Sequence, residues 1–452
     1  MPAKLLLTVF ALAVVPLSAQ QASDSQVLAQ VLQRLDSLEK QNRQLLEEVR
    51  ALREQVQNSD RAASPQAAAE TQTASLEDRV AVAEDRISEQ AQTKVEASQK
   101  FPISLTGTLL FNAFLNSGAN ANYSADAYGL LSGPERAGAT VRQTLLGLNF
   151  EGPQLPGDGQ VRGSLMMDFG SGYAQPGASW IRLRRGNISL DWKNRSFLVG
   201  QEKPLISPYQ PDSLAEVIIP PLSGAGNLWL WLPQARYEER VHFGQTNGLT
   251  GQIALLQTDE KYQNVPDEYA DTVAAARPAL QGRFAYWHAF DDTHRIEVAP
   301  GFHVSTSHVA GYSVDSRLAS LDWKATPWWK LEFTGTAFHG RNAAGLGALG
   351  NGFSILPNGD ITAVRSTGGW TQLSLPVTSR LKWNVFGGVE NDAAASLPAN
   401  AIVHNFTYAS NLMYRIGPNV IVSFEALQMR SRLFSGDFQK RNHYDLALGY
   451  LF

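Results

Sequence analysis

The sequence predicts an all-β transmembrane barrel of about sixteen antiparallel strands, preceded by an α-helical coiled coil. From Phe101 onward, apolar and polar residues alternate, and the alternating segments are joined by short and long connections in turn. The segment before Phe101 repeats apolar residues every seven positions instead. Alternation is typical of barrel strands with one face in lipid and the other in a polar lumen, whereas a heptad repeat indicates a coiled coil.

The start of the chain has the order of a secretory signal peptide. Lys4 supplies a positive charge, Leu5 to Val15 form an apolar run, and small residues follow up to Ala19. The run is shorter than the roughly 20 residues that a membrane-spanning helix needs. We therefore expect residues 1–19 to be a signal peptide. The sequence has no cysteine, so no disulfide can form.

Residues 20–57 are expected to form a periplasmic coiled coil. Two series of residues, apolar except for Asn42, each have a spacing of seven and alternate at spacings of three and four. They are Leu28, Leu35, Asn42, Val49 and Val56, and Val31, Leu38, Leu45 and Leu52. We expect Leu35, Asn42, Leu45 and Val49 to hold an oligomer together, because a buried Asn in such a repeat fixes register and helix number.

A single amphipathic helix is the alternative for this segment, but its apolar stripe is too narrow to pack on a globular core. Pro65 and a run of small residues end the heptad repeat. Residues 58–100 are therefore predicted to be a linker followed by a weaker second helix, and residues 101–452 to be the barrel.

The barrel region contains sixteen predicted strands. They are 102–116, 140–151, 160–170, 179–192, 195–202, 235–245, 249–258, 280–290, 294–304, 311–324, 328–340, 361–375, 379–391, 401–415, 419–430 and 442–452. If the first strand runs outward, the periplasmic connections are mostly two or three residues long and the extracellular ones are longer. This alternation of connection length is typical of outer-membrane barrels.

Alternation also assigns one face of each strand to the lumen. A charged residue that faces lipid near the bilayer centre costs about 2–4 kcal/mol, so charged residues in mid-strand should face inward. The expected pore-lining residues are Arg162, Arg182, Arg184, Arg236, Arg240, Arg283, Asp168 and Glu238. The apolar residues of 179–192 change parity, which predicts a β-bulge near Arg185 and Gly186. Sixteen strands leave an aqueous channel rather than a packed core.

The extracellular connection 203–234 is long and unusually apolar for a surface loop. We expect it to fold into the barrel or to pack against a neighbouring subunit, because either would cover its apolar residues. Its acids Asp212 and Glu216 would then face the inward arginines across a constriction. In the alternative interpretation, the arginines only pair with lumen acids such as Asp168 and Glu238.

The run Ser-Trp-Ile-Arg-Leu-Arg-Arg-Gly-Asn-Ile at 179–188, followed by Phe-Leu-Val-Gly-Gln at 197–201, resembles a strand pair of the phosphate-selective porin O and P superfamily. A coiled coil ahead of a sixteen-strand barrel is similar to the DcaP-type trimeric porins. The resemblance implies a homotrimer that passes small anionic solutes, with Arg182 and Arg184 on the pore wall. Lysines are sparse in the extracellular loops, so a lysine-lined phosphate trap is not expected.

The last predicted strand carries an aromatic stripe that includes Tyr450 and Phe452. This ending resembles the C-terminal signal by which the barrel-insertion machinery recognises outer-membrane proteins. That machinery, outer-membrane lipid and lipopolysaccharide are therefore expected partners, beside further copies of the chain and the anionic solutes.

These patterns together predict a porin of the bacterial outer membrane for passive diffusion of small hydrophilic, anionic solutes such as carboxylates. The alternative is an outer-membrane anchoring protein whose coiled coil binds peptidoglycan or a periplasmic partner. No enzyme activity, cofactor or metal site is expected, since no serine–histidine arrangement or metal-ligand spacing stands out. A net charge of −4 provides no positive surface for nucleic acid.

Overall fold

The computed structural model describes residues 103–117, 135–171, 180–260 and 267–452. The predicted signal peptide, coiled coil and linker lie outside these residues, and so do the predicted oligomer contacts Leu35, Asn42, Leu45 and Val49. No helix in the described ranges is long and apolar enough to cross a membrane.

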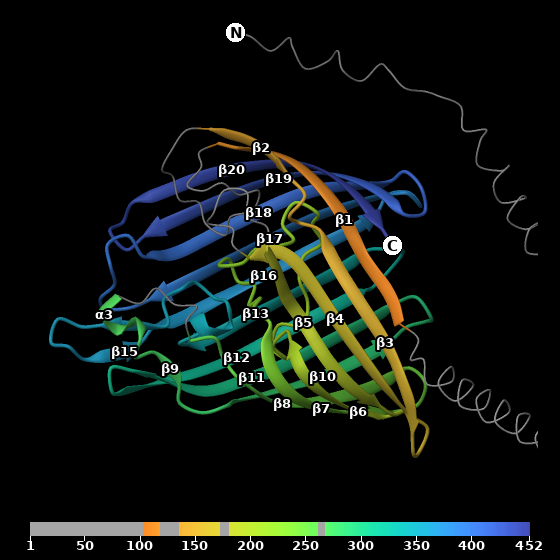
Figure 1. Cartoon of the computed structure of the whole chain (residues 1–452), viewed down its shortest axis with the longest axis horizontal. Coiled ribbons are helices and arrows are strands. Elements are labelled where there is room, and N and C mark those ends of the chain that lie inside the picture. The colour runs from red at the N-terminus through yellow and green to blue at the C-terminus, as the bar shows by residue number, and fades with distance from the viewer. Residues whose placement is uncertain (1–102, 118–134, 172–179, 261–266) are drawn as a thin grey trace, which may run out of the picture. The chain divides into compact units, whose positions relative to one another are not determined.

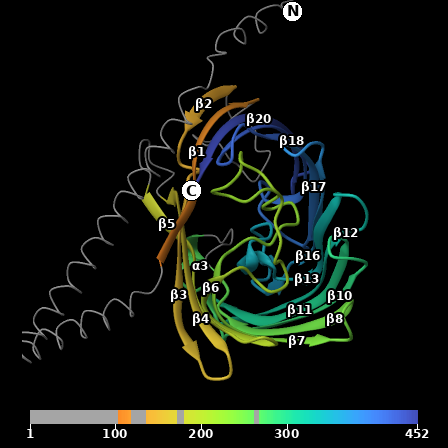
Figure 2. The same ribbon diagram turned by 90° about the vertical axis from the view of Figure 1, so that its right-hand side faces the viewer.

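One antiparallel sheet closes on itself to form a barrel (Figures 1 and 2). It contains eighteen strands, of which β2 (Arg136–Thr140) and β9 (Ala274–Ala275) are short. The remaining sixteen form the wall: β1 (Ile103–Asn116), β3 (Leu145–Leu155), β4 (Gly159–Ser171), β5 (Trp180–Asp191), β6 (Arg195–Glu202), β7 (Leu232–His242), β8 (Asn247–Leu256), β10 (Ala279–Ala289), β11 (Arg295–Val309), β12 (Tyr312–Thr326), β13 (Glu332–Arg341), β16 (Arg365–Pro376), β17 (Leu381–Ala393), β18 (Ile402–Arg415), β19 (Val420–Leu433) and β20 (Phe438–Leu451). The predicted strand number is confirmed.

The barrel closes where the first strand meets the last. β1 pairs with β3 along its first half, and with β20 from Thr108 opposite Leu451 to Asn116 opposite His443. At the end of β20, Phe452 exchanges two backbone hydrogen bonds with Gly107, of 2.9 and 3.2 Å. Because the wall is a ring, it leaves no long strand edge open to another chain.

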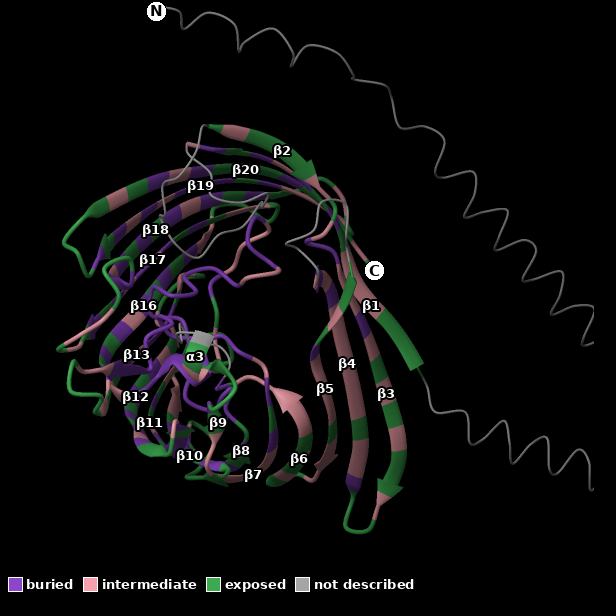
Figure 3. Cartoon of the chain, turned by 60° about the vertical axis from the view of Figure 1, so that its left-hand side comes forward, coloured by how far each residue is buried: buried purple, intermediate pink, exposed green. Residues whose placement is uncertain are grey.

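The outer surface of the barrel is apolar and the inner surface is polar. Exposed and buried positions alternate along the strands (Figure 3). In β20 the exposed side chains include Tyr444, Leu446, Leu448 and Tyr450, and the buried ones include His443 and Asp445. A protein that folds in water has the opposite arrangement, so this surface suits a lipid environment.

Tyr450 and Phe452, the residues predicted to signal insertion, both lie on this outer face and are partly exposed. Their rings stack with a centroid separation of 6.4 Å. The ring of Phe452 covers Gly107, where a Cβ atom would lie 2.9 Å from its Cζ atom. The packing locates both rings at the seam of the barrel, and their role as a signal stays a prediction.

Two predicted strands are wrong in part, because the chain leaves the wall within them. In the predicted strand 140–151 the backbone is irregular between β2 and β3, where Gln143 turns into the interior. In the predicted strand 361–375, β15 (Ile361–Ala363) pairs instead with β14 (Phe353–Ile355) in a separate small sheet. The wall strand begins only at Arg365.

The β-bulge predicted near Arg185 and Gly186 is present in β5. Met166 pairs with Arg185 and Met167 pairs with Leu183, so Arg184 is the extra residue. The extra residue changes the parity of the strand, as the apolar pattern required. It also places Arg184 and Arg185 side by side towards the interior.

Candidate functional site

Two connections at the long-loop end of the barrel fold into its interior, which Figure 2 shows as chain inside the ring. Loop A is residues 203–231, between β6 and β7. Loop B is residues 342–364, between β13 and β16, and it contains the short helix η1 (Ala344–Leu346) with β14 and β15. Most residues of both loops are buried. The inward course was one of two arrangements expected for loop A, and it was not expected for loop B.

The two loops form a hydrophobic core with each other and with the wall. Ile206, Leu228 and Trp229 of loop A pack in one cluster with Leu346 of loop B and Phe338 of β13. This cluster buries the apolar run that seemed out of place in a surface loop. The inward course of loop B was not predicted, because the loop is rich in alanine and glycine. These residues give a weak hydrophobic signal but allow close packing.

Amide side chains of the wall hold the backbone of loop A. Gln143 accepts hydrogen bonds from the amides of Val217 (2.8 Å) and Ile218 (2.7 Å) and donates one to the carbonyl of Ala215 (2.6 Å). An amide side chain can both donate and accept, so it suits a stretch of irregular backbone. The other wall amides that bond to the loop A backbone include Asn112, Gln281, Gln372, Asn405 and Asn411.

On the far side of the lumen, loop A lies directly on the backbone of the wall. A Cβ atom on Gly388 would stand 2.1 Å from the carbonyl oxygen of Ala225, and one on Gly226 would stand 2.4 Å from the backbone of Gly369. Gly226 also has a φ of +95°, which other residues rarely adopt. Glycine at these positions allows the loop to cross the whole barrel.

Arg182 and Arg184 lie inside the barrel, as the alternation predicted, and both contact loop A. The carboxylate of Asp168 lies 2.7 Å from the guanidinium of Arg182 and 3.5 Å from that of Arg184. Arg182 also donates to the carbonyl of Ile218 (2.5 Å), and Arg184 to that of Val217 (2.9 Å). The Arg184 guanidinium lies over the ring of Trp231, 4.3 Å from its centroid. These two arginines therefore position the loop as well as carrying charge.

Three other predicted pore residues are engaged by acids. Arg283 is bound by Asp322 (2.7 Å) and Glu297 (2.9 Å), and its side chain is only 6% exposed. Arg240 forms an ion pair with Glu238. Arg162 lies 3.3 Å from Asp191, and its side chain is 60% exposed. For these residues the pairing interpretation describes the contacts better than a free cationic wall does.

The two loop acids differ in their surroundings. Asp212 is ion-paired with Lys382 on β17, away from the arginines. Glu216 is buried, and its pKa is raised well above the usual range by burial and by the neighbouring charges of Glu425 and Asp445. The predicted facing of loop acids and wall arginines is therefore wrong for Asp212, and for Glu216 it stays a prediction.

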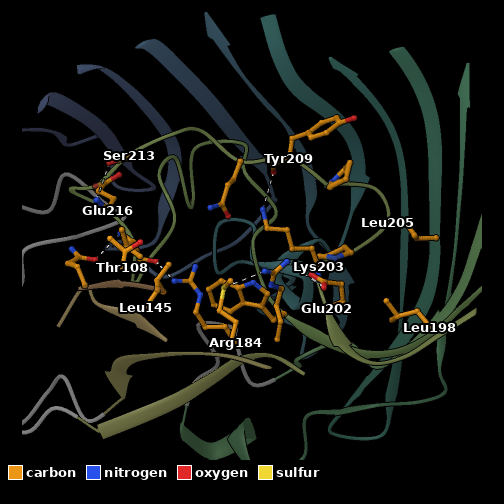
Figure 4. Close-up of a pocket in the computed structure, with 18 of the residues that line it drawn as sticks. Thr108, Leu145, Arg184, Leu198, Glu202, Lys203, Leu205, Tyr209, Ser213 and Glu216 are labelled. Atoms are coloured by element: carbon orange, nitrogen blue, oxygen red, sulfur yellow. Dashed lines mark hydrogen bonds and ion pairs between the residues drawn. The ribbon is translucent and has the colours of Figure 1, made fainter. Parts of the chain in front are cut away.

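A cavity of about 510 Å³ remains between loop A and the wall (Figure 4). Five cationic residues line it, against two acidic ones: Arg184, Arg185, Lys203, Arg236 and Arg283, with Glu202 and Glu216. Arg184 and Arg283 are held by the acids described above. Arg185 lies 3.7 Å from Glu202, and Arg236 has no acid within 4.0 Å among the described residues. We call Arg185, Lys203 and Arg236 the basic cluster.

Lys203 lies at the centre of the basic cluster, at the start of loop A. The ammonium of Lys203 donates to the carbonyl of Tyr209 at 3.3 Å. The carbonyl of Lys203 accepts a hydrogen bond from Arg236 at 2.9 Å. Burial, together with the positive charge of Arg184, lowers the pKa of Lys203 to about 7. Sequence analysis did not identify Lys203 as a site residue, because it treated Lys203 as one of a few scattered lysines in the extracellular loops. It did not identify Arg185 because the exact position of the bulge decides whether the Arg185 side chain faces the lumen or the lipid.

In the described ranges, no group of three or more histidine and acidic side chains is placed to hold a metal ion. The cavity thus offers positive charge, aromatic rings and backbone, which can attract and pass a solute. It offers no arrangement of a nucleophile with a base among these lining residues.

Comparison with known proteins gives a match in structure but not in sequence. No protein-family model and no curated protein sequence matches the chain. The outer membrane channel DcaP of Acinetobacter baumannii superposes with a TM-score of 0.63 at 17% identity, over 77% of this chain and 97% of that one. The fold is that of the outer-membrane porins.

Two further porins support this assignment of fold. The anion-selective porin from Comamonas acidovorans has a TM-score of 0.54 at 13% identity, over 78% of this chain and 100% of that one. OmpF of Salmonella typhi has a TM-score of 0.50 at 11% identity, over 78% of this chain and 99% of that one. Identities this low show a shared fold, and the resemblance to the phosphate-selective porin O and P superfamily stays a prediction.

Proposed function

We propose that this protein is a channel of the bacterial outer membrane that lets small hydrophilic anions cross by passive diffusion. The observation that carries the proposal is the cavity beside loop A, with more cationic than acidic residues on its lining. A guanidinium keeps its charge at any physiological pH and suits carboxylates and similar anions. The names of two proteins with this fold, an outer membrane channel and an anion-selective porin, agree with it.

The two inward loops would strengthen this preference. They replace water in the lumen by protein, so the field of the basic cluster is less screened along the remaining passage. Acids near the passage, such as Asp168, Glu202 and Glu297, oppose it. We therefore expect moderate selectivity rather than exclusion of cations.

We further propose a homotrimer with residues 20–57 as a periplasmic coiled coil, on the heptad repeat and the family resemblance. A mass other than that of three chains, measured on the intact assembly in mild detergent, would contradict the trimer.

The anchoring alternative predicts the same barrel. It differs in the lumen, because a protein that only anchors a periplasmic partner to the membrane needs no open passage. The cavity beside loop A, with its charged lining, favours the channel.

The decisive experiment is the reversal potential of the full-length protein in a planar bilayer with a potassium chloride gradient. We expect stepwise currents and a reversal potential on the chloride side of zero. A reversal potential on the potassium side would contradict anion preference. Insertion without any current would instead support the anchoring alternative.

Anion preference should weaken as the pH rises from 6 to 8. The pKa of Lys203 is lowered to about 7, so its positive charge is present below this range and lost above it. The charged groups that line the cavity around it include Arg184, Arg185, Arg236, Glu202 and Glu216. The permeability ratio of chloride to potassium, measured at both pH values, should fall in the wild type.

The matched control for this pH effect is Lys203→Met, which removes the titrating ammonium and keeps the length of the side chain. This variant should have a lower chloride-to-potassium ratio that is the same at both pH values. A wild-type ratio that does not change with pH, or a variant that keeps the full pH dependence, would show that Lys203 does not titrate in this range.

A further inference from the structure

The outer wall of the barrel has a hollow that its own side chains do not fill. The hollow has a volume of about 190 Å³ and lies over β7, β8, β10 and β11. We call it the outer dent, and its main lining residues are Tyr237, Gly251, Ile253, Gly282, Phe284 and Phe302. An apolar cavity of about 150 Å³ is enough to hold a molecule of benzene, so the dent could hold part of an acyl chain.

Two glycines make the outer dent, and they differ in how they are covered. At Gly282 the space of a side chain is occupied by the ring of Phe302, since a Cβ atom would stand 2.3 Å from its Cε1 atom. At Gly251 the space is open, because the nearest atom to a Cβ would be Cδ1 of Phe284 at 3.9 Å. The dent is therefore open towards the membrane at Gly251.

A carboxylate stands beside this opening on the lipid-facing side. Glu239 is the register partner of Gly251, and it shares the outward parity of the exposed Tyr237 and Val241. Its carboxylate accepts a hydrogen bond from the Tyr237 hydroxyl. Among the described residues, no cationic nitrogen lies within 4.0 Å of it. A charge on the lipid face is unfavourable unless it lies near the interface or gains a partner.

A cation lies on the other side of Glu239 in the same row of the sheet. Arg195, the first residue of β6, is the register partner of Glu239 and shares the outward parity of Phe197 and Val199. Its guanidinium lies 5.8 Å from the ring centroid of Trp192, and no carboxylate in the described ranges is within 4.0 Å of it. Arg195, Glu239 and the dent thus follow one another across three strands.

We propose that this row is a binding site for one phospholipid with an ammonium headgroup, of the phosphatidylethanolamine type. The phosphate would contact Arg195, the ammonium would contact Glu239, and an acyl chain would fill the outer dent. The site lies towards the short-turn end, where Arg195 begins its strand, which corresponds to the periplasmic leaflet. The proposal depends on the membrane location of the barrel but not on its ion selectivity.

The test uses full-length protein reconstituted into vesicles with equal amounts of phosphatidylethanolamine and phosphatidylglycerol. After extraction in mild detergent, the lipids that remain bound are counted by native mass spectrometry. We expect one bound phosphatidylethanolamine per chain and little phosphatidylglycerol. Glu239→Gln should lower the bound phosphatidylethanolamine about fivefold, the factor that corresponds to one exposed charge pair, and should leave phosphatidylglycerol unchanged.

Gly251→Leu should lower the retention of both lipids, because it fills the dent. A Cβ atom at Gly251 would meet no atom closer than 3.9 Å, so the new side chain starts in open space. Two matched controls should retain lipid as the wild type does. Leu446→Phe adds bulk to the outer face of β20, and Glu151→Gln removes an exposed carboxylate from β3.

Several results would overturn the lipid site. Equal retention of both lipids, retention of lipopolysaccharide in their place, or no effect of Glu239→Gln and Gly251→Leu would each do so. A Gly251→Cys variant that cross-links two copies of the chain would show that a neighbouring subunit covers the dent. Current through the same reconstituted protein is measured in parallel, so loss of the channel function is distinguished from loss of the lipid.

Discussion

Replacing Arg185, Lys203 and Arg236 together with glutamine is expected to abolish the preference for anions. These three side chains line the cavity, and no buried acid engages them as Asp322 engages Arg283. A charge a few ångströms from a passing ion contributes about 1 kcal/mol in water and more where protein replaces water. We therefore expect the chloride-to-potassium permeability ratio to fall by at least about tenfold.

The control for this triple variant removes three cations at the rim instead: Arg162, Arg380 and Arg415, all of which are exposed. The change in net charge is the same, but the cavity is intact. If the control lowers selectivity as much as the first variant, total charge rather than the basic cluster sets the preference. Arg182 and Arg184 are less suitable targets, because their loss would also release loop A.

Replacing Glu390 with alanine is expected to widen the passage by releasing both inward loops. This fully buried carboxylate on β17 accepts hydrogen bonds from Gly226 of loop A (3.3 Å) and from Leu349 of loop B (2.8 Å). An intramolecular hydrogen bond contributes about 0.5–1.5 kcal/mol to stability, so the variant loses two such contributions at the junction. Single-channel conductance should rise, and larger anions should pass.

The variant Glu390→Gln serves as the graded control, because it keeps the shape and one accepting oxygen. Its conductance should lie between those of the wild type and Glu390→Ala. Glu332→Ala, at the short-turn rim, should leave conductance unchanged. If Glu390→Ala conducts like the wild type while the barrel remains folded, the hydrophobic core between the loops is sufficient to hold them.

The wall was predictable because its signal is local. A strand in lipid must alternate apolar and polar residues, and the parity change before Ile188 even indicated the bulge. The short turns between strands set the number of strands. The interruption at Gln143 was not predictable, because its cause is the backbone of loop A, which lies 74 residues away in sequence at Val217.

The interior was less predictable because it depends on pairs of distant residues. Alternation shows that Arg283 faces inward, but only the register of β10 with β11 and β12 reveals that Glu297 and Asp322 surround it. In the same way, the partner of Asp212 is Lys382, 170 residues further along the chain. Sequence reasoning therefore found the arginine-bearing strands but not which of their charges are free.

The contacts of Asn112 have a consequence for the order in which the molecule assembles. The side-chain amide of this residue on the first strand donates to the carbonyl of Leu214 in loop A (2.7 Å) and to Asp445 on the last strand (2.9 Å). Asn112 therefore links loop A to the strand that closes the barrel, and we expect loop A to reach its final position only once that strand has arrived. Loop A should therefore become resistant to an added protease at the same time as the barrel closes. The time course of this resistance would then report when the final step of assembly takes place.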